Sequence, residues 1–358
     1  MTTSRRDEGQ TTDTEPRRRA HPRGKRPPTI LDVAAHAGVS RGTVSRVLQG
    51  GHNVSPASQE AVHAAIRKLG YVVNRAARSL VTQRAGSVAF LLSEPQERFF
   101  EDPNFTTLLR GCTTALAEHD IPLILITAGT EAERRRIAPF LSAHHVDGVL
   151  LISSHRGNPM IDHLRRANLP FVCCGKPLGE RDAVSYVAAN DREGARTMVR
   201  HLLESGRNRV ATIAGPQDTP GGLERLDGYR AMLTERGIAY DKRLVAIGDY
   251  SRASGEACMQ QLLINAPDVD AVFVASDLMA DGALMAIERA GLRVPDDIAV
   301  GGFDDSPVAS ATHPPLTTIR QPWDRISEMM VRRLLAQIDG EGPATVILPT
   351  ELVVRESA

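Results

Sequence analysis

From residue 86 to the C-terminus, short apolar runs alternate with longer amphipathic stretches, and this alternation constrains the fold more than any other feature. The runs have the length of strands, whereas the stretches carry the 3.6-residue apolar period of helices. A βαβα order predicts parallel sheets covered by helices on both faces. Because about 270 residues are too many for one such sheet, we expect an α/β body of two doubly wound subdomains with a cleft between them. Strand candidates are 87–93, 122–127, 148–153, 170–174, 209–214, 271–275 and 298–303, and helix candidates include 105–119, 131–144, 191–205, 223–236, 255–265 and 278–290.

The first 84 residues differ from the rest of the chain in charge. They contain 15 Lys and Arg against six Asp and Glu, a net charge of +9, although the whole chain is balanced at 43 against 43. The remainder therefore carries −9. A basic head on an acidic body is typical of a protein that binds a polyanion through one end. Residues 1–26 are polar and rich in Arg, Thr and Pro, and we expect a disordered basic tail there, whose role stays open.

The basic head also has the pattern of three short helices. Thr29 is placed to cap the first and Ser40 the second, and Gly38 ends the first helix with a residue that tolerates positive φ. The connection Ala-Gly-Val-Ser between the two has the length and turn chemistry of a helix-turn-helix. A Ser-Pro pair at 55–56 opens the third helix, which ends at Gly70.

Three segments of this region, TILDVAAHAGVSRGTVSRVL, NVSPASQEAV and LGYVVNRAARSL, follow one another almost continuously over residues 29–81. Together they resemble the DNA-binding head of the lactose/galactose-repressor (LacI/GalR) family. The resemblance implies an all-α helix-turn-helix DNA-binding domain over residues 27–73. It also implies a hinge helix and linker over residues 74–85.

The resemblance places a recognition helix in the major groove of operator DNA. Arg41, Gly42 and Arg46 would meet base edges, and an Arg fork can read guanine at roughly 1–3 kcal/mol of discrimination. Gly42 offers no side chain, so less is read at that position or the backbone approaches more closely. Short polar side chains would contact phosphates and set the register, although capping and turn formation are competing roles for them. These are Thr29, Ser40, Thr43, Ser45 and Asn53.

The segment 74–80 resembles the family's hinge helix, which enters the minor groove beside its partner. Its contact candidates are Asn74, Arg75 and Ala77, and Leu80 is the residue expected to wedge between base pairs. Seven residues are too few for a stable isolated helix, so its order should depend on DNA and on the paired subunit.

The resemblance continues through the body, which it identifies with the periplasmic-binding-protein fold. The motifs are ERLDGY, VASDLMADGAL, GLRVPDDIAVGGFDD and PPLTTIRQP. They imply an effector-binding and dimerisation domain over 86–358. Its N-subdomain would span about 86–188 and 318–344, and its C-subdomain about 189–317 and 345–358. The chain ends without the apolar heptads that some relatives use to form tetramers, so we expect a homodimer.

Polar and aromatic residues gather at the predicted carboxyl ends of strands, where ligands of open α/β sheets bind. Arg225 and Asp304 match family positions that hold ligand hydroxyls, and Glu94 is a further polar candidate. Asp277 is another, but it is as well explained as a cap of the helix that follows. Aromatic faces cover the apolar faces of sugar rings, which adds three candidates. The seven predicted effector-binding residues are Glu94, Phe99, Phe105, Arg225, Tyr250, Asp277 and Asp304.

The effector itself is predicted from a finer resemblance. ERFFEDPNF, ERRRIAPFLSAHHVDGVLLIS and CGKP look like the family members that respond to β-linked disaccharides such as cellobiose. A glucoside or xyloside is the nearest competitor. We therefore predict a repressor of carbohydrate uptake or utilisation genes, released by a small sugar from a palindromic double-stranded operator. A purine-type corepressor on the same fold, and a sugar-binding transport protein, are the alternatives.

Other classes fit the sequence poorly. No apolar run approaches the ~18 residues of a membrane helix, and the basic N-terminus lacks the apolar core of a signal peptide. The four Cys have neither CxxC spacing nor a nearby His, so no metal or cofactor is expected, and a reducing cytoplasm, on the nucleoid, fits best. The GVSRG segment satisfies G-x-S-x-G, but a helix precedes its Ser where an esterase needs a strand. We expect no enzyme.

Overall fold

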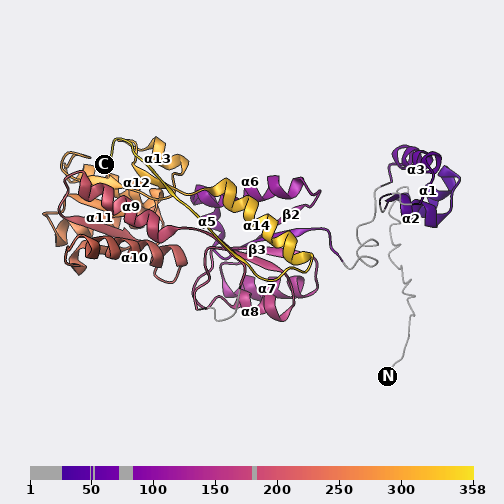
Figure 1. Cartoon of the computed structure of the whole chain (residues 1–358), viewed down its shortest axis with the longest axis horizontal. Coiled ribbons are helices and arrows are strands. Elements are labelled where there is room, and N and C mark those ends of the chain that lie inside the picture. Colours follow the sequence, from indigo (N-terminus) through magenta and orange to yellow (C-terminus); the bar gives the residue numbers. More distant parts are fainter. Residues whose placement is uncertain (1–25, 49, 51–52, 72–83, 180–183) are drawn as a thin grey trace, which may run out of the picture. The chain divides into compact units, whose positions relative to one another are not determined.

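The computed structural model describes residues 26–48, 50, 53–71, 84–179 and 184–358 (Figure 1). The chain divides into two compact units, residues 1–78 and 79–358, which we call the head and the body and describe separately. Within the described residues, the longest helices are too short or too polar to cross a membrane.

The head is built from α1 (Ile30–Ala37), α2 (Arg41–Leu48) and α3 (Pro56–Leu69), as the sequence predicts. Thr29 and Asp32 form a reciprocal capping box at the start of α1, and Gly38 ends that helix with φ 66°. The Ser40 hydroxyl accepts the Thr43 amide at 3.1 Å and so caps α2. One fully buried valine from each helix forms the centre of a small core, Val33, Val44 and Val62. This core aligns the two helices of the helix-turn-helix.

The first subdomain of the body is a parallel sheet of six strands in the order β11-β5-β4-β3-β1-β2. Alternate residues of β1 point to opposite faces, where α6 and α14 cover one side and α7 and α8 the other. The strands are β1 (Val88–Leu92), β2 (Leu123–Thr127), β3 (Gly148–Ile152), β4 (Phe171–Cys174), β5 (Tyr186–Ala189) and β11 (Thr345–Leu348). The helices are α5 (Gln96–Glu101), α6 (Pro103–Ala117), α7 (Glu131–Ser142), α8 (Pro159–Arg166) and α14 (Trp323–Ile338).

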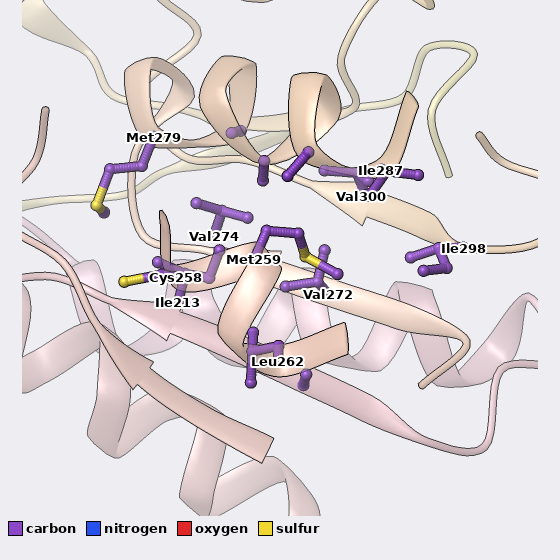
Figure 2. Close-up of a cluster of buried hydrophobic side chains, with 14 of the residues drawn as sticks. Ile213, Cys258, Met259, Leu262, Val272, Val274, Met279, Ile287, Ile298 and Val300 are labelled. Atoms are coloured by element: carbon purple, nitrogen blue, oxygen red, sulfur yellow. The ribbon is translucent and has the colours of Figure 1, made fainter. Parts of the chain in front are cut away.

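The second subdomain is a parallel sheet of four strands in the order β7-β6-β8-β9. Helices α9 and α10 cover one face, and α11 and α12 cover the other. Figure 2 shows the hydrophobic core between this sheet and the helices α11 and α12. There Met259 and Leu262 of α11 and Ile287 of α12 meet the side chains of the strands. The elements are β6 (Val210–Ala214), β7 (Val245–Ile247), β8 (Ala271–Val274), β9 (Ala299–Gly301), α9 (Asp191–Glu204), α10 (Pro220–Glu235), η1 (Lys242–Leu244), α11 (Arg252–Asn265), α12 (Asp277–Arg289) and α13 (Pro307–Ala311).

The two subdomains are joined by three chain crossings. The chain leaves the first sheet after β5, returns through β10 (Thr318–Arg320), and crosses again after β11 into β12 (Glu351–Val353). β10 and β12 pair antiparallel. The predicted start of the last C-subdomain segment at residue 345 is wrong, because Thr345–Leu348 pair with β5 and extend the first sheet. The doubly wound body itself is confirmed.

Candidate functional site

The exposed face of α2 carries the side chains predicted to read DNA bases. Arg41, Gly42 and Arg46 are all exposed, and the Arg46 guanidinium donates to the Gly42 carbonyl oxygen at 3.3 Å. Thr43 and Ser45 are half-buried. Because Val44 and Val47 anchor the opposite side of α2 in the core, this face is held toward solvent. The helix therefore presents two unburied guanidinium groups on one short surface, the arrangement that bidentate base recognition requires.

The other predicted DNA contacts differ in what the structure shows of them. Thr29 and Ser40 cap α1 and α2, which is the alternative to phosphate contact that the sequence predicted for them. Asn53 is exposed with φ 59°, a left-handed turn conformation that Asn tolerates. Asn74, Arg75, Ala77 and Leu80 lie outside the described residues.

A pocket of about 160 Å³ lies in the body and is lined from both subdomains. The first subdomain contributes residues that follow β1 and β3 together with the starts of α6 and α14. The second contributes the start of α10 and the loops after β7, β8 and β9. Because parallel strands all end at the same edge of a sheet, the two sheets bring their carboxyl ends together here. Five of the seven predicted effector residues line it: Glu94, Phe105, Arg225, Tyr250 and Asp304.

Arg225 is the centre of the second-subdomain wall. Its Nε donates to Asp191 at 2.8 Å, and its Nη1 donates to the Ala275 carbonyl oxygen at 2.6 Å and to Asp304 at 3.4 Å. The guanidinium also lies 3.8 Å from the centre of the Phe303 ring. Although burial disfavours its charge, the two carboxylates raise the pKa of Arg225. The hydrogen bonds between described residues use Nε and Nη1, so Nη2 is the nitrogen that a ligand can reach.

Asp304 joins the two walls of the pocket. Its carboxylate accepts hydrogen bonds from Asn104 of α6 at 3.0 Å and from Gln321 at 2.8 Å, in addition to Arg225. Burial raises the pKa of the Asp304 carboxyl, while the guanidinium of Arg225 opposes that rise. Its φ of 122° lies in the left-handed region, an uncommon conformation that turns this residue toward the pocket. A buried guanidinium between two carboxylates is suited to paired hydrogen bonds with vicinal hydroxyls.

A second connection between the walls runs through His155, which follows β3. Its Nε2 lies 2.9 Å from Glu94 of the first subdomain, and its Nδ1 lies 2.8 Å from Asp218 of the second. Glu94 also accepts the Ser153 hydroxyl. Hydrogen bonds that the imidazole donates to the two carboxylates, Glu94 above all, raise the pKa of His155 to about 9. The imidazole is therefore protonated at neutral pH, and we call Glu94, His155 and Asp218 the cross-cleft bridge.

Two predicted effector residues lie outside the pocket. Phe99 is 7% exposed and packs into the core beneath α5. Asp277 is fully buried, and its carboxylate accepts the Ser306 amide at 2.7 Å and the Thr318 hydroxyl at 2.5 Å. It is not the cap of α12 either, since Ser276 has that role. Asp277 instead holds the β10 crossing against the start of α12.

Other pocket residues were missed by sequence reasoning. Four of them lie within the segments ERFFEDPNF and PPLTTIRQP, but neither segment shows which of its side chains face the pocket, and the others come from elements distant in sequence, such as α14. These residues include Arg98, Asp102, Asn104, Ser154, Asp191, Thr219, Gln321 and Trp323. Burial raises the pKa of Cys174, which also lines the pocket, to about 12, so its thiol is protonated and is no nucleophile.

Comparison with known proteins connects both regions to one group. Residues 29–74 match the family of bacterial regulatory proteins of the lacI type, and residues 199–358 match a periplasmic binding protein-like domain. The chain is 47% identical to the HTH-type transcriptional regulator CelR of Thermobifida fusca, over 93% of this chain and 99% of that one. It is 34% identical to the ribose operon repressor of Escherichia coli K12, over 87% of this chain and 93% of that one.

Solved structures of transcriptional regulators are also similar to this chain. A CelR–cellobiose complex has a TM-score of 0.76 and 45% identity, and the match covers 92% of this chain and all of that one. The lac repressor dimer bound to operator and the anti-inducer ONPF has a TM-score of 0.81 and 28% identity, over 93% of this chain and 99% of that one.

Proposed function

The chain belongs to the LacI family of bacterial regulatory proteins and is a DNA-binding transcriptional regulator, and on that premise we propose that a cellobiose-like disaccharide is its effector. In this proposal the protein is a homodimer on a palindromic operator in the cytoplasm, bound to the nucleoid. It represses carbohydrate uptake or utilisation genes until the sugar binds.

The observation that carries this proposal is the composition of the pocket. Its second-subdomain wall holds Arg225 between Asp191 and Asp304, a donor and acceptor set that matches neighbouring hydroxyl groups. Three aromatic side chains, Phe105, Tyr250 and Trp323, line the same space and can cover the apolar faces of sugar rings. A CelR–cellobiose complex at 45% identity supports a β-linked disaccharide over other sugars.

Release from DNA follows from where the pocket lies. A ligand held by both walls binds the closed body better than an open one, so it shifts the population toward closure. Closure changes how the two N-subdomains of a dimer meet, and the family resemblance of residues 74–85 implies that operator binding is then weakened. The ligand can shift the equilibrium only by its difference in affinity for the two states, so contacts that exist only when the cleft is closed are the decisive ones.

The proposal is tested by measuring the affinity for a fluorescent operator duplex while cellobiose, a glucoside, a xyloside, ribose or a purine is added. We expect cellobiose to weaken operator binding at low concentration and the purine to have no effect. A purine that tightens binding would instead make the protein a corepressed regulator. Sedimentation of the complex counts the subunits, and two chains per operator are expected.

A further inference from the structure

The loop between β9 and α13 contains two consecutive residues in the left-handed region of backbone conformation. Asp304 has φ 122° and Asp305 has φ 54°, although neither is a glycine. Residues in such conformations persist only where their surroundings hold them, and they occur mostly at ligand-binding and switch segments. Asp304 lines the pocket, whereas Asp305 is not among the described residues that line it. A predicted effector residue is thus joined by one peptide bond to a residue whose side chain has its contacts elsewhere.

The Asp305 carboxylate binds two arginines that belong to different chain crossings. It accepts a hydrogen bond from Nε of Arg320 in β10 at 2.7 Å and one from Nη2 of Arg355, two residues after β12, at 2.6 Å. The Asp305 side chain is only 9% exposed, so its end of both bonds is shielded from solvent. Hydrogen bonds between ionised groups are the strong ones. The carboxylate therefore ties the segments of β10 and β12 together, and we call Asp305, Arg320 and Arg355 the crossing clamp.

The backbone of the same loop is bonded to β10. The Gly302 amide donates to the Thr317 carbonyl oxygen at 2.8 Å, and the Asp304 amide donates to the Ile319 carbonyl oxygen at 2.7 Å. The Gln321 amide donates back to the Asp304 carbonyl oxygen at 3.2 Å. β10 is therefore attached to the second subdomain, and α14 of the first subdomain begins only three residues after β10 ends.

We infer that Asp305 is a positioning residue that transmits effector binding at Asp304 to the chain crossings, and through them to operator release. A ligand hydroxyl bound to Asp304 changes the balance of its hydrogen bonds with Asn104 and Gln321. Any rotation of Asp304 passes through one peptide bond to Asp305, which shifts β10 and β12 together and with them the start of α14. Packed segments of this kind move between discrete arrangements, which amplifies a small shift. This inference rests on the proposed function and names the residue through which the effector acts on the first subdomain.

The crossing clamp can be broken from either side. Asp305→Asn removes the charge that binds the two arginines, and because Asn tolerates the left-handed conformation as Asp does, it adds no backbone strain. Arg355→Gln removes one arginine, and the double variant shows whether the two residues act as a unit. The matched control is Asp297→Asn, whose carboxylate binds Arg293 at 2.8 Å within the loop that follows α12.

Three readings are taken for each protein: the affinity for cellobiose without DNA by calorimetry, the melting temperature, and the operator affinity with and without saturating cellobiose by fluorescence anisotropy. In both single variants the cellobiose affinity should change less than about 2-fold, because the pocket lining is intact. The ratio of the two operator affinities should fall about 2- to 30-fold, the range that changes between coupled sites produce. The double variant should lower this ratio no further, and Asp297→Asn should keep the wild-type ratio.

A wild-type ratio in both single variants would overturn the inference, and a lower melting temperature alone would then show a merely structural role. A cellobiose affinity that falls as much as the ratio would also overturn it, because Asp305 would then act on the pocket itself. A wild-type protein whose operator affinity no sugar changes would instead refute the proposed function. In that event hydrogen exchange of the free protein decides the inference. Amides of β10 should exchange at least several-fold faster in Asp305→Asn while those of β6 do not, and equal exchange in β10 would show that Asp305 does not hold the crossings.

Discussion

Replacing Asp218 with Asn removes the charge that holds His155 across the cleft, and we expect it to weaken effector binding. The pKa of His155 rises from 6.5 to about 9, which corresponds to about 3 kcal/mol of preference for the protonated imidazole at ~1.4 kcal/mol per pH unit. Glu94, the largest cause, lies in the same subdomain and stays beside His155 when the cleft opens. The Asp218 side chain is 55% exposed, so solvent screens its share. The share of Asp218 that favours the closed cleft is therefore about 1 kcal/mol, which corresponds to roughly a 5-fold change in effector affinity.

The dependence on pH has a definite sign. A raised pKa of His155 in the closed state means that protonation of its imidazole favours closure. The stabilisation of the closed cleft by His155 is therefore complete below about pH 6.5 and disappears as pH rises through about 9. Calorimetric titration with the effector at pH 6.5, 8 and 9.5 should show the difference between wild type and Asp218→Asn shrinking toward zero. Asp227→Asn is the matched control, because its ion pair with Arg192 lies within the second subdomain.

Equal affinities for wild type and Asp218→Asn at pH 6.5 would refute the reasoning. So would a difference that persists unchanged at pH 9.5, because the imidazole would then have no part in it. A loss of the same size in Asp227→Asn would show that any surface charge has this effect.

Three further changes test the head and the pocket. Leu80→Ala should lower operator affinity about 10-fold in fluorescence anisotropy if it wedges between base pairs, and an unchanged affinity contradicts that role. Arg46→Ala should reduce the ratio of specific to non-specific affinity by about 5- to 150-fold at fixed salt, whereas Arg67→Ala on α3 should leave the ratio unchanged. Gly215→Ala should weaken effector binding at least several-fold in calorimetry, because a Cβ there would collide with the Tyr250 ring that lines the pocket; normal binding would mean that Tyr250 moves without consequence.

The local structure of the head could be predicted from the sequence because its signals lie within a few residues of one another. The Thr29 cap, the Gly38 stop and the Ser-Pro pair act on adjacent backbone, and each helix forms where they place it. Seven strands of the body were predicted equally well, since an apolar run between turn residues is also a local signal. Five short strands went unpredicted, namely β5, β7, β10, β11 and β12.

The pocket depends on pairings that no local pattern encodes. Asp191 lies 34 residues before Arg225 and Asp304 lies 79 after it, yet the three meet because the starts of α9 and α10 and the end of β9 lie together at the pocket. Phe99 and Phe105 looked alike in sequence, but only the tertiary structure places the first in the core and the second in the pocket.

The sequence by itself therefore determined the class of protein, the capped helices of its DNA-reading head and the βα order of its body. The tertiary structure alone decided which carboxylate faces which guanidinium, that His155 reaches across the cleft, and that Trp323 of α14 lines the pocket. The physical reason is range. Caps and periodicity act over a few residues of one segment, whereas the pocket is assembled by sheet order and chain crossings between segments far apart in the chain.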